Sequence, residues 1–459
     1  MKKRSVCTSV LCIILAVLML TVCACNTGSQ TGQEDKTTET KETSGVKISA
    51  LVAKKDAKKG SVLTVKDVEV IEVDQASTGD DYLTMPTQVV SKPLLVDIKA
   101  GDVICASMLG KSDYKPSGNI SVSIARKLGY LVVTDYFKPD TGEDLAYKIQ
   151  NLIDSNPRRT IFFPDGVYTI TKPIKTSSNP KKAVSLHLSG NAVIKASDKW
   201  RGGAEYMIQL GAIEETFTTY ATGSNYYMYG GVIDGNAKAK ALALEGGRET
   251  SVRQISIKNA VDGLFIAYNA VYTSNDCDFE SIEIEGCGFA GSVGVLVSGM
   301  DNTLTDIRIT GFETAMQLTA PGNLMHNVYA VYKPSEYIDY SKSIGFSDTC
   351  GSNWMDGFTS EGYHTAFKIA GGGLDMIHDC TAIWNNQYGD SAVAIDADGK
   401  FSSIVNNLRA DFVDGMSNVF LKLGRTGGRG VIKYPIFDTS KTADETYKTH
   451  LYGKVIWSK

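Results

Sequence analysis

The sequence has 459 residues, of which 43% are hydrophobic, 44 are glycine and 11 are proline. This length allows two or three domains, and the apolar content supports packed cores rather than a disordered chain. The formal net charge is −4. A mildly acidic chain without basic clusters is a poor candidate for nucleic-acid binding.

The first 24 residues open with the basic sequence MKKR and continue into an apolar stretch that ends VCAC at residues 22–25. A basic start followed by a short apolar run predicts a secretory signal peptide. The ending resembles the bacterial lipobox, which implies cleavage before Cys25 and lipidation of its sulfur. The protein would then be held on the outer face of the bacterial cell membrane. The alternative is a plain signal peptide with incidental cysteines.

Two short regions follow the signal. Residues 26–45 contain no large apolar side chain, so 25–45 is expected to be a flexible tether. Residues 46–112 then alternate short β-rich runs with turns. The pairing of AKKDAKKGSVLTVKDVEV with LLVDIKAGDVICASML resembles the SAF domain, a small β-clip module. That resemblance implies a binding or assembly surface more than a catalytic one.

The third region begins near residue 119. Apolar residues at positions 145, 149, 152 and 153 predict a helix with one buried face, and Thr141 with Asp144 suggests a capping box at its start. The sequence RTIFFPDGVYTITKPI then predicts two strands around a Pro-Asp-Gly turn.

This helix and hairpin resemble the start of the pectate-lyase superfamily. The motif residues are Phe162, Phe163, Pro164, Gly166 and Tyr168. The resemblance implies a right-handed parallel β-helix over residues 119–435, with 436–459 as a C-terminal cap or tail.

Internal repeats predict the same architecture. Seven segments share an alternating strand followed by a polar or glycine turn, at intervals of roughly 21 to 28 residues, as expected of a solenoid. Their first inward residues are expected to be Ile255, Ile282, Ile307, Val328, Met355, Cys380 and Leu408. The predicted fold class is therefore all-β, a right-handed single-stranded parallel β-helix preceded by a small SAF-type β-clip domain.

Two acidic segments are interpreted as structural. Asp234, in YGGVIDGN, is expected to cap a turn with its side chain rather than act as a catalytic acid. Related pectate lyases use calcium-binding acids and a nearby base, so Asp276, Asp278 and Glu280 make calcium the cofactor to consider. With no basic residue close in sequence, we interpret them as a solvated turn. The cysteines after Cys25 form no C-x-x-C pair, so no zinc site is predicted.

The motif set of the polygalacturonase-like hydrolases is not intact, so candidate catalytic residues come from a second acidic group. Glu361, Asp390 and Asp414 follow the inward residues of three successive coils, by 6, 10 and 6 positions. Adjacent coils would separate the carboxylates by about 5 Å and alternate coils by about 9.5 Å, as in retaining and inverting glycosidases respectively. His364 is the candidate for assisting proton transfer.

Four aromatic residues accompany these acids. Trp354, Tyr363, Trp384 and Tyr388 are candidates for stacking on sugar rings. The alternative is that the acids are ordinary turn residues and the aromatic residues are packed inside.

The function expected from these observations is handling of a polysaccharide or cell-wall glycan. The first hypothesis is a membrane-tethered glycoside hydrolase or polysaccharide lyase that acts on an acidic or plant-type glycan. The second is a non-catalytic glycan-binding or envelope assembly protein positioned by its SAF module. A sugar epimerase or isomerase is the third.

Overall fold

The structure, a computed structural model, describes residues 47–63, 66–74, 81–84, 89, 93–109, 120–213, 226–267, 274–370, 374–385, 388–397, 402–423, 430–438, 441 and 455–458. The predicted signal peptide, Cys25 and the tether lie outside these residues. The chain divides into two compact units, one formed mainly by residues up to Leu109 and one mainly by Gly110–Lys459.

The N-terminal unit is a small β structure. Strand β1 (Lys47–Ala53) pairs antiparallel with β2 (Val68–Asp74), and isolated bridges join Val52 to Val103 and Ala57 to Ile98. A 3-10 helix, η3, spans Ala106–Met108. The compact arrangement of short strands agrees with the β-clip expected from the sequence.

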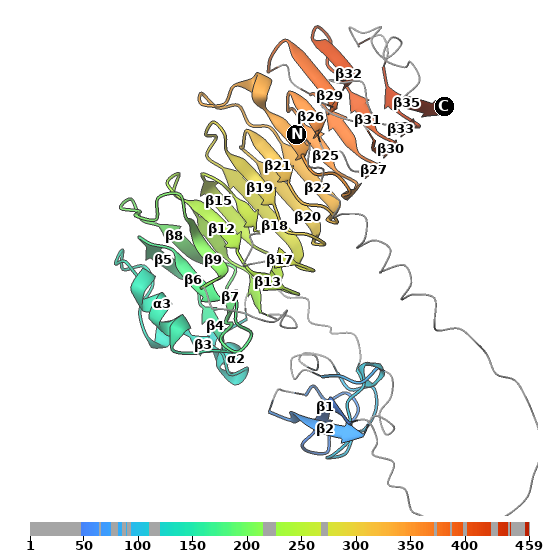
Figure 1. Ribbon diagram of the computed structural model, residues 1–459. Helices are drawn as coiled ribbons and strands as arrows, with labels where there is room; N and C mark the ends of the chain where they lie inside the picture. Colours follow the sequence, from blue (N-terminus) through green and yellow to red (C-terminus); the bar gives the residue numbers. More distant parts are fainter. Residues whose placement is uncertain are drawn as a thin grey trace, which may run out of the picture. The chain divides into compact units, whose positions relative to one another are not determined.

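The second unit is a stack of coils, each of which contributes strands to three parallel rows (Figure 1). Rows A and B together form the 21-stranded sheet, and row C is the 10-stranded sheet. Row A contains β4 (Thr160–Phe163), β7 (Ser185–Leu188), β10 (Tyr227–Tyr229), β14 (Ser251–Arg253), β24 (Trp354–Asp356), β27 (Met376–His378), β30 (Ile404–Asn406), β33 (Gly430–Lys433) and β35 (Val455–Ser458).

Row B contains β5 (Gly166–Ile170), β8 (Ala192–Ala196), β11 (Val232–Asp234), β15 (Ser256–Ala260), β25 (Thr359–Glu361), β28 (Thr381–Ile383), β31 (Arg409–Asp411) and β34 (Ile436–Phe437). Three long strands, β18 (Asp278–Gly286), β20 (Thr303–Thr310) and β22 (Leu324–Val331), run through both rows.

Row C contains β6 (Ile174–Ser177), β9 (Tyr206–Ile213), β12 (Lys240–Leu244), β16 (Leu264–Ile266), β19 (Val293–Val297), β21 (Thr314–Leu318), β23 (Ile344–Asp348), β26 (Thr365–Ile369), β29 (Ser391–Ala397) and β32 (Ser417–Leu423). A short side ladder pairs β13 (Gly247–Arg248) with β17 (Ser274–Asn275). The predicted parallel β-helix is confirmed.

One end of the stack is covered by short helices (Figure 1). Helix α3 (Ala146–Asp154) buries Ile149, Leu152 and Ile153 in the main core. Helix α2 (Val122–Lys127), strand β3 (Leu131–Val132) and the 3-10 helix η4 (Val133–Asp135) precede it. The expected capping box does not form, because Asp144 accepts instead from the nearby backbone N–H of Ala146 at 3.1 Å. Within the described residues no helix is long and apolar enough to span a bilayer.

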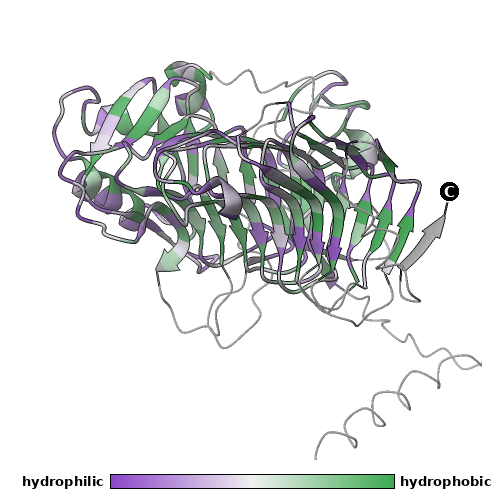
Figure 2. Ribbon diagram, turned by 90° about the horizontal axis from the view of Figure 1, so that it is seen from above, coloured by the Kyte–Doolittle hydropathy of each residue, from purple (hydrophilic) through white to green (hydrophobic). Residues whose placement is uncertain are grey.

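The interior is built from stacked apolar residues (Figure 2). In row A, Met325, Met355 and Ile377 are buried and lie in register on consecutive coils. Neighbouring parallel strands lie about 4.8 Å apart, so each side chain packs directly on its equivalent in the next coil.

This register corrects one expectation. The residue equivalent to Val328 is Phe358, because Tyr329 is paired with Thr359; Met355 belongs to the preceding strand. The sequence pattern placed that coil three residues out of register. Both residues are buried, so hydrophobicity alone does not separate them.

A single left-handed residue bends the chain between rows A and B in most coils. The residues with positive φ at this corner are Gln254, Ser281, Asp306, Asn327, Gly357, Asp379, Asn407 and Tyr434. One such residue redirects an extended chain without breaking the ladder on either side, and Asn, Asp and Gly tolerate this conformation best. The side chains also bond along the stack, as Asn407 donates to Asp379 at 2.7 Å.

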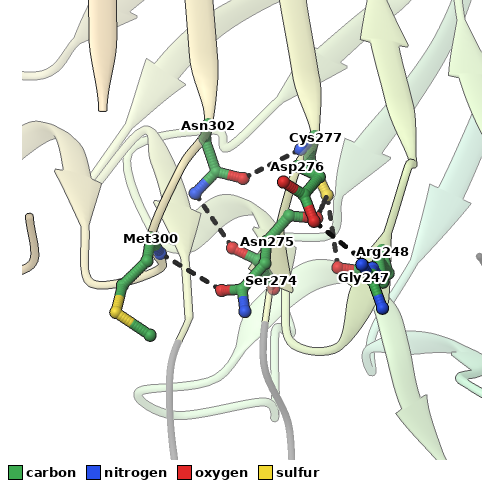
Figure 3. A network of polar contacts seen from close by, with 8 residues as sticks. All are labelled: Gly247, Arg248, Ser274, Asn275, Asp276, Cys277, Met300 and Asn302. Atoms are coloured by element: carbon green, nitrogen blue, oxygen red, sulfur yellow. Dashed lines mark hydrogen bonds and ion pairs between the residues drawn. The ribbon is translucent and has the colours of Figure 1, made fainter. Parts of the chain in front are cut away.

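A ladder of buried polar residues runs just before the row A strands. Asn302 accepts from the backbone N–H of Cys277 at 3.1 Å and donates to Ser274 (Figure 3). In the following coils, Asn302 N–H donates to Asn323 and Asn323 N–H donates to Asn353. These hydrogen bonds provide partners for backbone groups that are buried in the solenoid interior and have no access to water.

The ladder ends in two buried acids. Asp375 accepts from the backbone N–H of Asn353 at 3.1 Å, and Asp348 accepts from the Asn353 side chain at 2.6 Å. Burial, and then the charge of Asp348, raises the pKa of Asp375 to about 7. The pair is therefore stabilised when one proton is bound.

Asp234 has the predicted structural role. Its Oδ1 accepts from the backbone N–H of Asn236 at 2.9 Å and from the side chain of Asn259 at 3.0 Å. Asn236 has a left-handed φ of 52°. The carboxylate therefore stabilises the turn and links it to the next coil.

Candidate functional site

The four predicted catalytic residues lie where the chain passes from row B to row C, on three successive coils. Glu361 ends β25, and its carboxylate accepts from the Tyr329 hydroxyl and from Asn385 Nδ2, the latter at 3.0 Å. The bond to Glu361 is the main cause that raises the pKa of Tyr329. Glu361 is thus held in place by two hydrogen-bond donors.

His364 and Asp390 meet through a residue that the sequence reasoning did not select. Ser391 Oγ lies 3.1 Å from His364 Nε2 and 3.3 Å from Asp390 Oδ1. The rings of Tyr340 and Tyr388 lie beside this group, since Tyr340 contacts both His364 and Tyr388. The chain therefore forms one polar cluster at the start of β26 and β29.

The predicted line of three acids does not form. Glu361 is in register with Ile383 in the next coil, and Ile383 with Asp411 in the coil after it. Asp390 precedes a row C strand instead. Asp414 is exposed and pairs with Lys441 at 3.3 Å. All three acids lie where the chain passes from row B to row C, but these connections differ in length. Glu361 ends β25, Asp390 comes just before β29, and Asp414 lies between β31 and β32, so the acids do not align.

Two of the predicted sugar-stacking residues are core residues. Tyr363 and Trp384 are 0% and 2% exposed. Trp384 donates to the Tyr363 carbonyl at 2.6 Å and stacks on Phe412 at 4.8 Å between centroids. Their ring faces are covered by protein, so the expected sugar contact is incorrect for these two. Tyr388 is half-buried.

Trp354 is 50% exposed on the outer face of row A. It lies in register with Leu324 on one side and Met376 on the other, and Ile404 follows. Leu324 is 39% exposed. These four side chains form a stripe along the stack, which we call the apolar stripe.

A polar stripe runs beside it, two residues further along each strand. It consists of His326, Asp356, His378 and Asn406, in register on four consecutive coils. Because side chains alternate along a strand, both stripes point away from the core. Asp356 lies two positions after Trp354, a predicted sugar-stacking residue, but none of the four was itself predicted as a site residue.

Hydrogen bonds orient the two histidines differently. Nδ1 of His326 lies 3.0 Å from Oδ2 of Asp356. A carboxylate only accepts, so this Nδ1 carries the proton and Nε2 is the basic nitrogen. Nδ1 of His378 lies 3.2 Å from the amide nitrogen of Asn406, which places its proton on Nε2. The polar stripe thus presents a proton acceptor and a proton donor on alternate coils.

In the coils that precede the two stripes, ion pairs lie on the outer surface. Arg253 lies 3.2 Å from Glu280 and 3.6 Å from Asp278, and Arg248 lies 3.2 Å from Asp276 (Figure 3). The acids considered for calcium are thus paired with arginines of the preceding coil, and they are not simply solvated. Among the described residues no group of three or more His, Cys, Asp or Glu is arranged to hold a metal ion.

Comparisons with known proteins support the two-part architecture. The family model for SAF domains matches residues 48–110, so this region is a SAF domain. A search of curated protein sequences found no match. The enzymatically active domain of tailspike protein 2 of bacteriophage CBA120 is 9% identical with a TM-score of 0.50, over 83% of this chain and 55% of that one. This likeness supports the solenoid fold.

Two further solved structures have lower TM-scores. Endo-xylogalacturonan hydrolase from Aspergillus tubingensis is 13% identical with a TM-score of 0.43, over 66% of this chain and 96% of that one. The A-module of a mannuronan C-5 epimerase from Azotobacter vinelandii is 14% identical with a TM-score of 0.45, over 72% and 100%.

Proposed function

We propose that this protein is a bacterial cell-surface lipoprotein whose solenoid binds a polysaccharide and cleaves it. Lipidation at Cys25 would fix the chain to the membrane, and residues 25–45 would tether the folded units. The basic and apolar start, the VCAC sequence and the polar run after it support this placement.

The observation that carries the proposal is the pairing of the two stripes on row A. A sugar ring has an apolar C–H face and a polar hydroxyl rim. Trp354 offers an exposed aromatic face, and Asp356 with His378 offers hydrogen-bonding groups beside it. An extended polymer laid along the stack would meet this combination on successive coils, because the coils repeat about every 4.8 Å.

The polar stripe also supplies groups for the chemistry. Nε2 of His326 accepts a proton, and Asp356 stabilises the imidazolium that forms. Nε2–H of His378 donates a proton to a departing oxygen. The two histidines could serve either reaction. In hydrolysis His326 would take its proton from water, and in elimination it would take it from the sugar.

The corner cluster is the second candidate set. Glu361 and Asp411 stand two coils apart in one column, so their backbones are separated by about 9.6 Å. This matches the upper end of the range of about 6.5–9.5 Å between the acids of inverting glycosidases. Glu361 therefore remains a proposed catalytic residue, with Asp411 as its partner. His364 and Asp390 also remain proposed catalytic residues, and Asp414 and Tyr388 remain proposed contributors, where the chain passes from row B to row C.

The test is a screen of the full-length protein, purified in detergent, against pectins and other uronic-acid polymers. New reducing ends without absorbance indicate hydrolysis, and absorbing unsaturated products indicate a lyase. Asp356→Asn and Glu361→Gln decide which set acts. The proposal of cleavage is wrong if no polymer yields product under any condition.

The SAF match favours a second candidate function, a non-catalytic glycan-binding or envelope assembly protein. Retention of a polymer or of cell-wall material without any product would support it. A change in sugar stereochemistry without cleavage, read by NMR, would instead support an epimerase.

A further inference from the structure

At the corner between rows B and C, the hydroxyl of Ser391 lies against the imidazole of His364. Glycan cleavage does not require such a pair. His364 precedes β26 and Ser391 begins β29, two strands that lie in register as parallel neighbours in row C. The Nε2–Oγ distance is 3.1 Å, within the range for a base and the hydroxyl that it activates.

The imidazole is fixed on its other side. Its Nδ1 lies 3.1 Å from Oγ1 of Thr365, a buried residue whose branched side chain has little rotational freedom. When this Nδ1 donates to the Thr365 hydroxyl, Nε2 has no proton and faces Ser391 as an acceptor. Thr365 therefore acts as a positioning residue.

The backbone on both sides of the contact is also held. The N–H of His364 donates to Ser343 Oγ at 2.9 Å, and its carbonyl accepts from Val393 N–H at 2.8 Å. Gly389 lies against Tyr340, where a Cβ would approach the ring to 2.3 Å. Any larger residue at position 389 would clash with this ring. The glycine therefore lets the backbone that leads to Asp390 and Ser391 lie against Tyr340.

The surroundings keep the imidazole in its basic form. Burial lowers the pKa of His364, and the positive charge of Lys422 lowers it further. The acids Asp396, Asp390 and Asp339 oppose this. His364 and Ser391 are nevertheless both partly exposed, so a small group from solvent can approach the hydroxyl.

We propose that Ser391 and His364 are a nucleophile and its general base in a second activity, the hydrolysis of carboxylic esters such as acyl groups on glycan hydroxyls. Asp390 Oδ1, 3.3 Å from Ser391 Oγ, is a second and more distant acceptor for this hydroxyl than His364 Nε2. This activity is independent of polysaccharide cleavage by the row A stripes, because it uses different residues and a different bond. It shares His364 and Asp390 only with the second candidate set, at the corner between rows B and C.

The steps balance without a cofactor. His364 Nε2 takes the Ser391 proton while Oγ bonds to the acyl carbon. The bond from that carbon to the alcohol oxygen breaks, and the alcohol leaves with the proton from His364. A water molecule then gives a proton to His364 and its oxygen to the acyl carbon. The bond from that carbon to Ser391 Oγ breaks, the proton passes from His364 to Oγ, and a carboxylic acid is released.

The experiment treats the full-length protein in detergent with a fluorophosphonate probe and locates the label by mass spectrometry. Labelling of Ser391 in the wild-type protein is the expected result, together with hydrolysis of p-nitrophenyl acetate. His364→Asn should slow both by about 100-fold or more. The matched control is Ser298→Ala, since the Ser298 hydroxyl faces Thr319 at 2.8 Å; it should leave both rates unchanged.

Two further measurements separate a catalytic role from a structural one. The labelling rate should rise with pH with an apparent pKa below about 6.5, the ordinary value for histidine, and Thr365→Val should alter that apparent pKa. Absence of label on Ser391 in folded wild-type protein would overturn the proposal, as would equal labelling in His364→Asn. No polysaccharide is used, so failure here is distinct from failure of the polymer screen.

Discussion

Nδ1 of His326 lies 3.0 Å from Oδ2 of Asp356, on the next coil of the solenoid. The residues are separated by 30 positions in sequence, and parallel stacking makes them neighbours on the outer face of row A. Trp354 stands two residues before Asp356 on the same strand and on the same face. This relationship places an acid–base pair beside an exposed aromatic ring.

Asp356→Asn is expected to slow polymer cleavage by about 100-fold or more, because an amide does not stabilise the imidazolium formed on His326. Polymer binding should change little. The measurement is the initial rate of product release at saturating polymer. Asp379→Asn is the control, since Asp379 is an exposed acid at the corner of the next coil. Unchanged cleavage in Asp356→Asn would assign the chemistry to the Glu361 corner.

Trp354→Ala and Trp384→Ala should differ in their effect on stability. Trp384 is buried, so its loss should lower the free energy of unfolding by about 3–5 kcal/mol. Trp354 is half-exposed, so its loss should leave stability nearly unchanged. Urea denaturation of both variants checks this difference. Equal destabilisation would mean that Trp354 is also covered by protein.

Asn323→Ala is expected to destabilise the solenoid by about 2 kcal/mol or more. Asn323 accepts from the backbone N–H of Asn302 and donates to the Ala320 carbonyl. Each buried group left without a partner costs about 1–3 kcal/mol. Asn385→Ala, at an exposed position, is the control for denaturation. A loss no larger than that of the control would show that the polar ladder contributes little.

The buried acid pair predicts a pH effect on stability. The pKa of Asp375 is raised to about 7, above the value of about 3.9 in an unfolded chain. The folded state therefore binds the extra proton, and stability should fall as pH rises from about 4 to about 7, by up to about 3 kcal/mol.

His187 acts in the opposite direction. Burial lowers its pKa to about 4, so its contribution is lost as pH falls below about 6.5. Asp375→Asn removes only the first effect. Its unfolding free energy should therefore rise more steeply with pH, between pH 4.5 and 7, than that of the wild-type protein. Parallel profiles would show that Asp375 titrates normally.

The sequence predicted the fold because the solenoid repeats simple local signals. Alternating strands and a turn recur in each coil, and the helix residues Ile149, Leu152 and Ile153 lie on one buried face as expected. The turn role of Asp234 was also predictable, since Gly235 and Asn236 follow it. These features depend on residues close together in the chain.

The site was less predictable because it depends on register between coils. In the sequence Met355-Asp356-Gly357-Phe358, the corner residue is glycine, whereas the equivalent corners carry Asn327 and Asp379. The corner was therefore not visible, and Met355 was aligned with Val328. The three-residue error is confined to this coil, because Cys380 and Leu408 are again in register with Phe358. It hid the alignment of Asp356 with His326 and His378, so the polar stripe was missed.

The sequence also did not predict which aromatic residues are exposed. Trp354 and Trp384 both stand near turns, but Trp384 stacks on Phe412, which comes from the next coil. A contact of this kind is decided by the packing of residues 28 positions apart, which a single sequence pattern does not specify.

The most direct measurement of the central claim is equilibrium binding of uronic-acid polysaccharides to the full-length protein and to two single aromatic variants. Trp354→Ala should weaken binding by about tenfold, because a stacked aromatic ring contributes on the order of 1–2 kcal/mol. Tyr147→Ala, which removes a ring 75% exposed on helix α3, should bind like the wild-type protein. Equal binding by Trp354→Ala and wild type, or equal loss in both variants, would contradict a polysaccharide site on row A.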